Sequence, residues 1–147
     1  MGVYRGVTQD NVTIEKGTLY DVTLSNPTIT GTLTGDVVGN ITFPVAAVAA
    51  AGSSSTDATA ISNYGVVHAT GADGTKGVKL PVAAAGKVVI VKNSDAANAI
   101  LKVYPATGDK INSGTATTGS LNMAAKTSAV LVAIDATDWF SIPLLPS

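Results

Sequence analysis

The chain contains no cysteine, one histidine and few charged or aromatic residues. Of its 147 residues 13% are charged and 5% aromatic, whereas an ordinary soluble domain has about 25% charged residues. The lack of cysteine excludes a disulfide framework and a thiolate metal site. The net charge of −1 argues against nucleic-acid binding, which requires a basic surface. We therefore expect no nucleic-acid partner.

Long apolar runs are missing too. The longest, around residues 45–51, consists of Ala and Val and falls short of the ~18 residues that cross a bilayer. The first residues show no hydrophobic signal-peptide region, so we expect neither a membrane segment nor export. Disorder is excluded because 46% of the residues are hydrophobic. Small and β-branched residues dominate instead, with 22 Ala, 19 Thr, 18 Val and 15 Gly.

Charge is distributed unevenly along the chain. Residues 1–75 carry two basic and six acidic side chains, a balance of −4, with no Lys or Arg between Lys16 and Lys76. Residues 76–147 carry seven Lys and four Asp, a balance of +3. A surface of Thr, Ser, Asn and Gly without long charged side chains suits a segment wrapped by copies of itself. The sequence thus predicts two parts with different surroundings.

The most informative segment runs from Ile29 to Phe43. Its odd positions alternate apolar residues with glycine, and its even positions are polar except for Val38. If extended, these residues reach about 50 Å, and a lone strand of that length cannot bury its apolar face. We predict an intertwined β-stalk over residues 16–44, most simply a homotrimer. The predicted trimer interface is formed by Ile29, Leu33, Val37, Ile41 and Phe43.

An alternative interpretation of this segment is a pair of ordinary strands. Turns at Thr34-Gly35 or Val38-Gly39 would then break it within one globular sheet. After it, residues 45–56 are rich in Ala and Ser, with at most one helical turn over 46–51 and a flexible stretch from Gly52. We predict a linker here and a domain boundary near Gly52.

From residue 57 to 147 short apolar runs alternate with turn signals. With no amphipathic helix, this pattern indicates an all-β domain, an antiparallel β-sandwich or small barrel of about eight strands. The predicted strands are Ala58–Ser62, Val66–Thr70, Gly77–Leu80, Lys87–Lys92, Ile100–Tyr104, Ser120–Met123, Ser128–Ile134 and Trp139–Ile142.

Two of these runs, Val88–Val91 and Val130–Ile134, are apolar on both faces. Such strands lie centrally or have one face covered by a neighbouring subunit. The large side chains expected to fill the core of this domain are those of Tyr104, Ile111, Trp139 and Phe140.

Residues with catalytic or metal-binding chemistry are few. The only imidazole, His68, lies in a predicted strand, where it is one side chain among neighbours. Asp36 with Asn40 and Asp135 with Asp138 come nearest to a metal pair, but the second pair fits a turn before Trp139 better. A glycosidase needs two facing carboxylates, and no Glu follows residue 15. We predict no catalytic, cofactor or metal residue, and no enzyme.

Several motifs of the C-terminal part resemble a module of tailed-bacteriophage structural proteins. They are Thr70-Gly-Ala-Asp-Gly-Thr-Lys-Gly-Val-Lys-Leu-Pro81, Gly86-Lys-Val-Val-Ile-Val-Lys-Asn93, Leu101-Lys-Val-Tyr-Pro105 with Gly108-Asp-Lys-Ile-Asn112, and Asp138-Trp-Phe-Ser141. Residues 11–43, with Asn26-Pro-Thr-Ile-Thr-Gly, resemble the β-stalks of phage fibres. The first likeness covers about residues 57–142.

This resemblance implies a homotrimeric capsid decoration or head-fibre protein on the outer capsid surface, or else a tail-fibre component. Residues 1–15 would then form an arm on the major capsid protein, with Val3, Tyr4, Arg5 and Val7 as attachment residues. In the alternative, the C-terminal domain recognises a host surface glycan through an exposed aromatic residue, for which Trp139 and Tyr64 are the candidates. No cofactor and no catalytic residue come with the resemblance.

Overall fold

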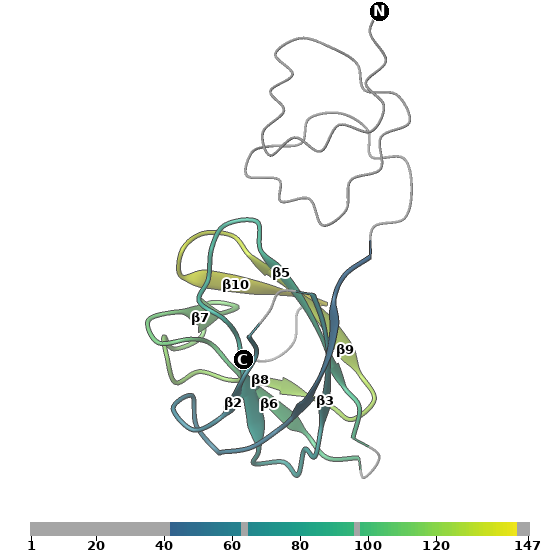
Figure 1. Cartoon of the computed structure of the whole chain (residues 1–147). Helices are drawn as coiled ribbons and strands as arrows, with labels where there is room; N and C mark the ends of the chain where they lie inside the picture. The colour runs from purple at the N-terminus through teal and green to yellow at the C-terminus, as the bar shows by residue number, and fades with distance from the viewer. Residues whose placement is uncertain (1–41, 63–64, 96–97, 144–147) are drawn as a thin grey trace, which may run out of the picture. The chain divides into compact units, whose positions relative to one another are not determined.

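A computed structural model describes residues 42–62, 65–95 and 98–143 (Figure 1). Within these ranges the chain forms strands and no helix, so the all-β prediction is confirmed. The larger sheet has the order β1-β3-β5-β9-β10-β7, with bounds Val45–Ala49, Gly65–Thr70, Val88–Asn93, Ser128–Ala133, Asp138–Ile142 and Lys110–Ile111. The smaller sheet has the order β2-β4-β6-β8, with bounds Thr59–Ala60, Gly77–Lys79, Leu101–Tyr104 and Leu121–Met123.

The first six strands alternate between the two sheets. β1, β3 and β5 are parallel neighbours in the larger sheet, and β2, β4 and β6 are parallel neighbours in the smaller one. Val45 lies opposite Val66 and Val66 opposite Ile90, so one turn of the winding takes 21 residues and the next takes 24. Such a winding is a β-solenoid.

The predicted antiparallel sandwich or barrel is therefore wrong for the part from β1 to β6. The alternation of apolar and polar residues reports which face is buried, and it says nothing of the direction of the neighbouring strand. Antiparallel pairing does occur in the second half, where β9 lies between β5 and β10, and β8 pairs with β6. The predicted intertwined stalk over 16–44 lies outside the described residues, except for 42–44.

The linker predicted over residues 45–56 is wrong in its first half. Val45–Ala49 is strand β1, which pairs with β3 along its whole length. An Ala/Val run too short for a stable helix gains ladder hydrogen bonds by lying along the edge of β3. The residues after it form a turn around Asp57, whose carboxylate accepts hydrogen bonds from the backbone N–H groups of Ser53 and Ser54.

The core lies between the sheets and contains the inward side chains of both. All eight predicted strands overlap observed ones, whereas β1 and the two-residue β7 were not predicted. Ile111 and Trp139 lie in the core as predicted, whereas Tyr104 is buried outside the core, on the outer side of β6. The prediction for Phe140 is wrong, because successive residues of a strand point to opposite faces. With Trp139 inward, Phe140 is directed outward and is exposed.

Candidate functional site

A row of five apolar side chains crosses the outer face of the larger sheet. Val45, Val66, Ile90, Val130 and Ile142 lie opposite one another on β1, β3, β5, β9 and β10. They face away from the core, because their strand neighbours, such as Val67, Val91 and Leu131, are the buried ones. Each residue of the row therefore extends the same apolar surface across five strands.

A second row lies two residues further along the strands. Val88, Val132 and Phe140 are opposite one another on β5, β9 and β10, and Ile134 follows Val132 after the end of β9. Exposed fractions reach 67% at Val45, 62% at Ile134, 54% at Ile142 and 43% at Phe140. We call these nine residues the apolar face: Val45, Val66, Val88, Ile90, Val130, Val132, Ile134, Phe140 and Ile142.

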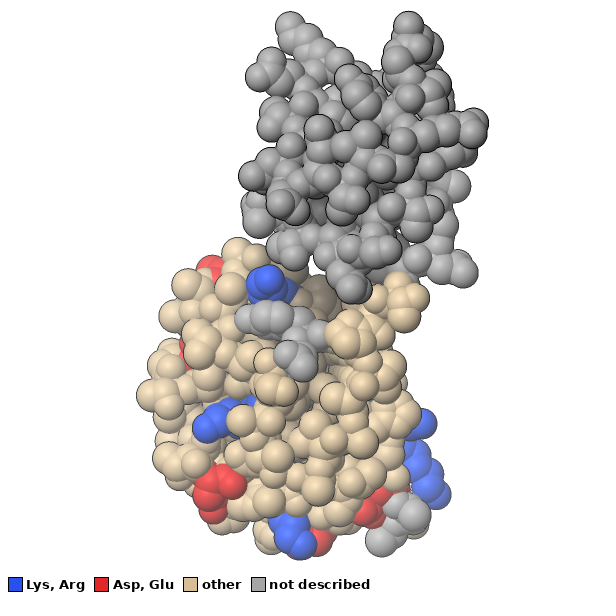
Figure 2. Space-filling view, in the orientation of Figure 1, with Lys and Arg blue, Asp and Glu red and all other residues tan. Residues whose placement is uncertain are grey.

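Polar residues border the apolar face along the strands. On one side the next row consists of Ala47 and three polar residues, His68, Lys92 and Ser128, and all four are exposed. On the other side Lys110 of β7 forms an ion pair with Asp138 of β10, with 3.3 Å between Nζ and Oδ1. The outer surface of one sheet is thus apolar in one part and polar at its borders. Figure 2 shows basic and acidic side chains on the visible surface of the described residues, separated by larger areas without charge.

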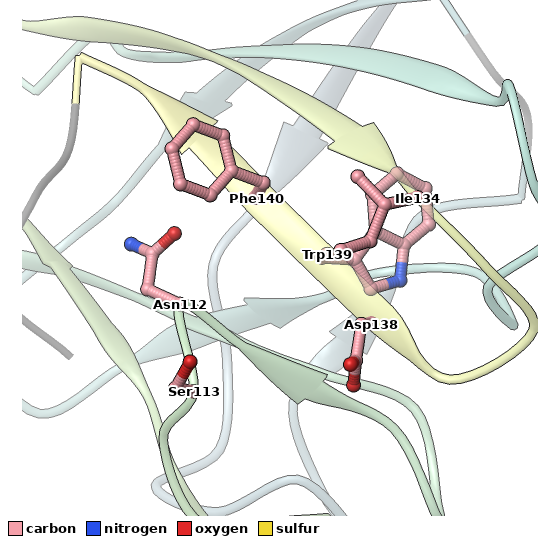
Figure 3. Close-up of a pocket in the computed structure, with 6 residues that line it drawn as sticks. All are labelled: Asn112, Ser113, Ile134, Asp138, Trp139 and Phe140. Carbon is pink, nitrogen blue, oxygen red and sulfur yellow. The ribbon is translucent and has the colours of Figure 1, made fainter.

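A hollow of about 260 Å³ lies at the β7 side of the apolar face (Figure 3). Asn112 is held in place there, since its Nδ2 donates to Ser141 Oγ at 2.7 Å and its Oδ1 accepts from Ser141 N at 2.8 Å. One side of the hollow is apolar and the other carries amide, hydroxyl and carboxylate groups. The residues that line it are Asn112, Ser113, Ile134, Asp138, Trp139 and Phe140.

The outer face of the smaller sheet has a different character. Lys102 Nζ donates to Asn122 Oδ1 at 3.0 Å, across the pair β6–β8. The Tyr104 ring lies against Gly77, where a Cβ atom would come within 2.6 Å of it. The Tyr104 hydroxyl donates to the Ser53 carbonyl oxygen at 2.6 Å, so the turn around Asp57 contacts this ring. Polar groups and a covered ring thus occupy this face.

Two aspartates make the same kind of turn. Asp73 Oδ1 accepts hydrogen bonds from the Thr75 hydroxyl and from the N–H groups of Thr75 and Lys76, and these bonds hold the pKa of Asp73 well below its usual range. Asp135 Oδ1 accepts from the N–H groups of Thr137 and Asp138, which lowers the pKa of Asp135 in the same way. The predicted turn before Trp139 is confirmed.

Asp57 is held in a similar manner. The Ser54 hydroxyl is the main cause of its lowered pKa, followed by the N–H groups of Ser53 and Ser54. These three aspartates stabilise turns, and their oxygens are occupied by local hydrogen bonds. Among residues 42–62, 65–95 and 98–143, no three His, Cys, Asp or Glu side chains come together as a metal site would require.

The sequence-predicted site residues have different outcomes. Phe43 directly precedes Pro44 and β1 and is half exposed. Trp139 is 1% exposed, which confirms its prediction as a core residue and rules it out as the exposed aromatic residue of the glycan alternative. His68 is exposed in the polar row of β3. The remaining predicted residues lie outside the described ranges: Ile29, Leu33, Val37 and Ile41 of the trimer interface, Val3, Tyr4, Arg5 and Val7 of the attachment arm, and Tyr64.

The apolar face as a whole was not predicted, although a signal for it exists in the sequence. The runs Val88–Val91 and Val130–Ile134 are apolar at every position, which predicts strands covered on both faces. The structure covers one face with the core and leaves the other to form part of the apolar face. The apolar face also includes residues of other strands, and the parallel register of β1, β3 and β5 decides which residues these are.

Comparisons with protein-family models, with curated proteins and with solved structures gave no match to this chain. In the described part of the chain no helix is long and apolar enough to cross a membrane.

Proposed function

We propose that this chain is a non-enzymatic structural protein of a virion. In this proposal it is a homotrimeric capsid decoration protein, of the cement or head-fibre kind, that sits on the outer capsid surface. The observation that carries the proposal is the apolar face, because an uncharged surface spread over five strands suits a protein whose copies cover one another. The likeness of its motifs to phage structural proteins supplies the virion context.

In the proposed assembly three chains associate through residues 16–44. The arms formed by residues 1–15 then contact the major capsid protein at Val3, Tyr4, Arg5 and Val7. One trimer bridges several coat subunits and resists expansion of the shell. Each arm needs only a weak contact, since a trivalent ligand gains affinity through the high effective concentration of its second and third arms.

The mass of the purified protein in solution tests the self-association. Light scattering on the full chain should give three times the 14.6 kDa chain mass. The variant Leu33→Asp, which places a charge in the predicted trimer interface, should give the mass of one chain. A wild-type chain that is monomeric at micromolar concentration overturns the proposal.

The location of the chain tests the virion role. In a cryo-EM map of the particle, we expect density for the wound β-domain on the head, above the junctions between coat subunits. Density on the tail instead would overturn the decoration role and favour a tail-fibre component.

The hollow beside Phe140 favours a second candidate function, recognition of a host surface glycan. Sugar-binding hollows combine an apolar wall with a few well-placed polar groups, and here Phe140 and Ile134 face Asn112, Ser113 and Asp138. In this case Phe140→Ala should abolish binding to a glycan array while the mass of the protein stays unchanged. If the wild-type chain binds no glycan on the array, glycan recognition is excluded as a candidate function.

A further inference from the structure

We infer that the apolar face is the lateral contact between the β-domains of two copies of this chain, and that it closes only while their N-terminal parts hold the copies together. The inference rests on the proposed self-association and assigns it a second surface. It places the contact on β1, β3, β5, β9 and β10, which are all described.

The composition of the face favours a copy of this chain as the occupant. Its nine residues are all Val, Ile or Phe, and the charged side chains nearest to it are at its borders, on Lys92, Lys110 and Asp138. A charged partner such as nucleic acid or an acidic membrane surface finds no complementary group within the face. The other copies of this chain carry the same uncharged apolar face, and three such faces turned toward a common threefold axis match one another in chemistry. Each copy then contacts the next through different parts of its face, as the subunits of a closed ring do.

The position of the face in the chain points the same way. Val45, at one end of the five-residue row, is three residues after Thr42, where the described part begins. The 41 residues before Thr42 include four of the five residues of the predicted trimer interface, and the fifth, Phe43, directly follows Thr42. An association of copies through those residues therefore brings the copies of Val45, and with them the rows that begin there, close to one another.

The size of the face explains why it needs this tether. With strands about 4.8 Å apart and rows about 6.7 Å apart, each residue covers about 32 Å², so the nine residues cover about 290 Å². A standard stable interface buries about 800 Å² on each partner. The face alone provides about a third of that area, whereas a tether raises the effective concentration of a neighbouring copy to about millimolar. The N-terminal association therefore lets a face close that is too small to hold two free β-domains together.

Thiol labelling tests this inference cleanly, because the natural chain contains no cysteine. In the full chain, Ile142→Cys places one thiol in the face, and Val82→Cys places one in the β4–β5 connection. The two positions are similarly exposed in a single copy, at 54% and 65%. We expect the thiol of Ile142→Cys to react at least tenfold more slowly with a bulky maleimide than that of Val82→Cys. Adding Leu33→Asp, which separates the copies, should remove the difference.

A matched pair of charge substitutions on β9 completes the test. Val130→Glu, within the face, should raise the labelling rate of Ile142→Cys to that of the control. Ser128→Glu, two residues away on the same side of the strand, should leave the slow rate unchanged.

The possible outcomes separate the two proposals. Fast labelling of Ile142→Cys in a chain with trimer mass overturns the inference and leaves the proposed trimer standing. Slow labelling in a chain with monomer mass overturns both, because residues of the same chain then cover the face. Protection that survives Val130→Glu in a chain with trimer mass also overturns the inference, since a charge in a true apolar contact would open it.

Discussion

The two sheets share one core and differ on their outer faces. Inward residues of both are apolar, with Val89, Leu131 and Trp139 on the larger sheet and Leu101 and Val103 on the smaller. Outward, the smaller sheet has the Lys102–Asn122 hydrogen bond and the covered Tyr104 ring, whereas the larger sheet has the apolar face. The fold requires the apolar core, whereas the outer face of each sheet reflects its surroundings. The polar outer face of the smaller sheet fits contact with water. The apolar outer face of the larger sheet fits contact with another protein surface.

The largest effect is expected on the free energy of unfolding, where substitutions on the inner side of β9 should cost more than substitutions on its outer side. Leu131→Ala removes a fully buried side chain and should lower the free energy of unfolding by about 2–5 kcal/mol, because it leaves a cavity. Val130→Ala, on the outer side, should lower it by about 1 kcal/mol or less. Urea unfolding at one fixed protein concentration measures both. Equal losses would show that the two sides of β9 are packed alike.

A dye that binds exposed apolar surface measures the second effect. In Leu33→Asp, where the copies should separate, the fluorescence of anilinonaphthalene sulfonate should rise several-fold above that of the wild-type chain, because the apolar face becomes accessible. Adding Val130→Glu and Ile142→Glu should reverse most of the rise. Adding Lys102→Glu on the smaller sheet should not. A rise that both sets of changes remove equally would contradict the difference between the sheets.

A smaller effect is expected on the outer side of the smaller sheet. Tyr104→Phe keeps the ring over Gly77 and removes the hydroxyl that donates to the Ser53 carbonyl. The free energy of unfolding should fall by about 1 kcal/mol, the usual value of one such hydrogen bond. Urea unfolding gives the number, and hydrogen exchange at Ser53 and Ser54 should become faster. Unchanged exchange there would mean that Asp57 alone holds the turn.

The smallest effect is the pH dependence of the three aspartate turns. Their lowered pKa values mean that the unfolded chain binds more protons than the folded one, so stability is lost as pH falls below the ordinary aspartate range. Asp73→Asn should make the decline of the melting temperature between pH 5 and 2 shallower. The effect should be slight, because these carboxylates are exposed. A decline identical to that of the wild-type chain would remove Asp73 as a contributor.

The sequence predicts well which residues form strands, and it predicts poorly which strands pair with one another. Alternation of apolar and polar residues is a local property, so it identified eight strands and the burial of Trp139. Parallel pairing of residues 21 to 24 positions apart has no local signal, so the solenoid winding and strand β1 were missed. Phe140 was misplaced because the sequence alone does not tell which of two adjacent aromatic residues faces the core. The apolar face needs that pairing as well, since it arises only when β1, β3, β5, β9 and β10 are aligned.

The two ends of the parallel β-solenoid winding differ in how their strands are paired. At its C-terminal end the antiparallel strands β8 and β9 lie against β6 and β5 and close it, so no further parallel turn can be added there. At its other end, within the described residues, β1 has a neighbouring strand on one side only. A further turn of 21 to 24 residues inserted directly before β1 would continue the parallel pairing of β1, β3 and β5 and leave the layer around Trp139 as it is.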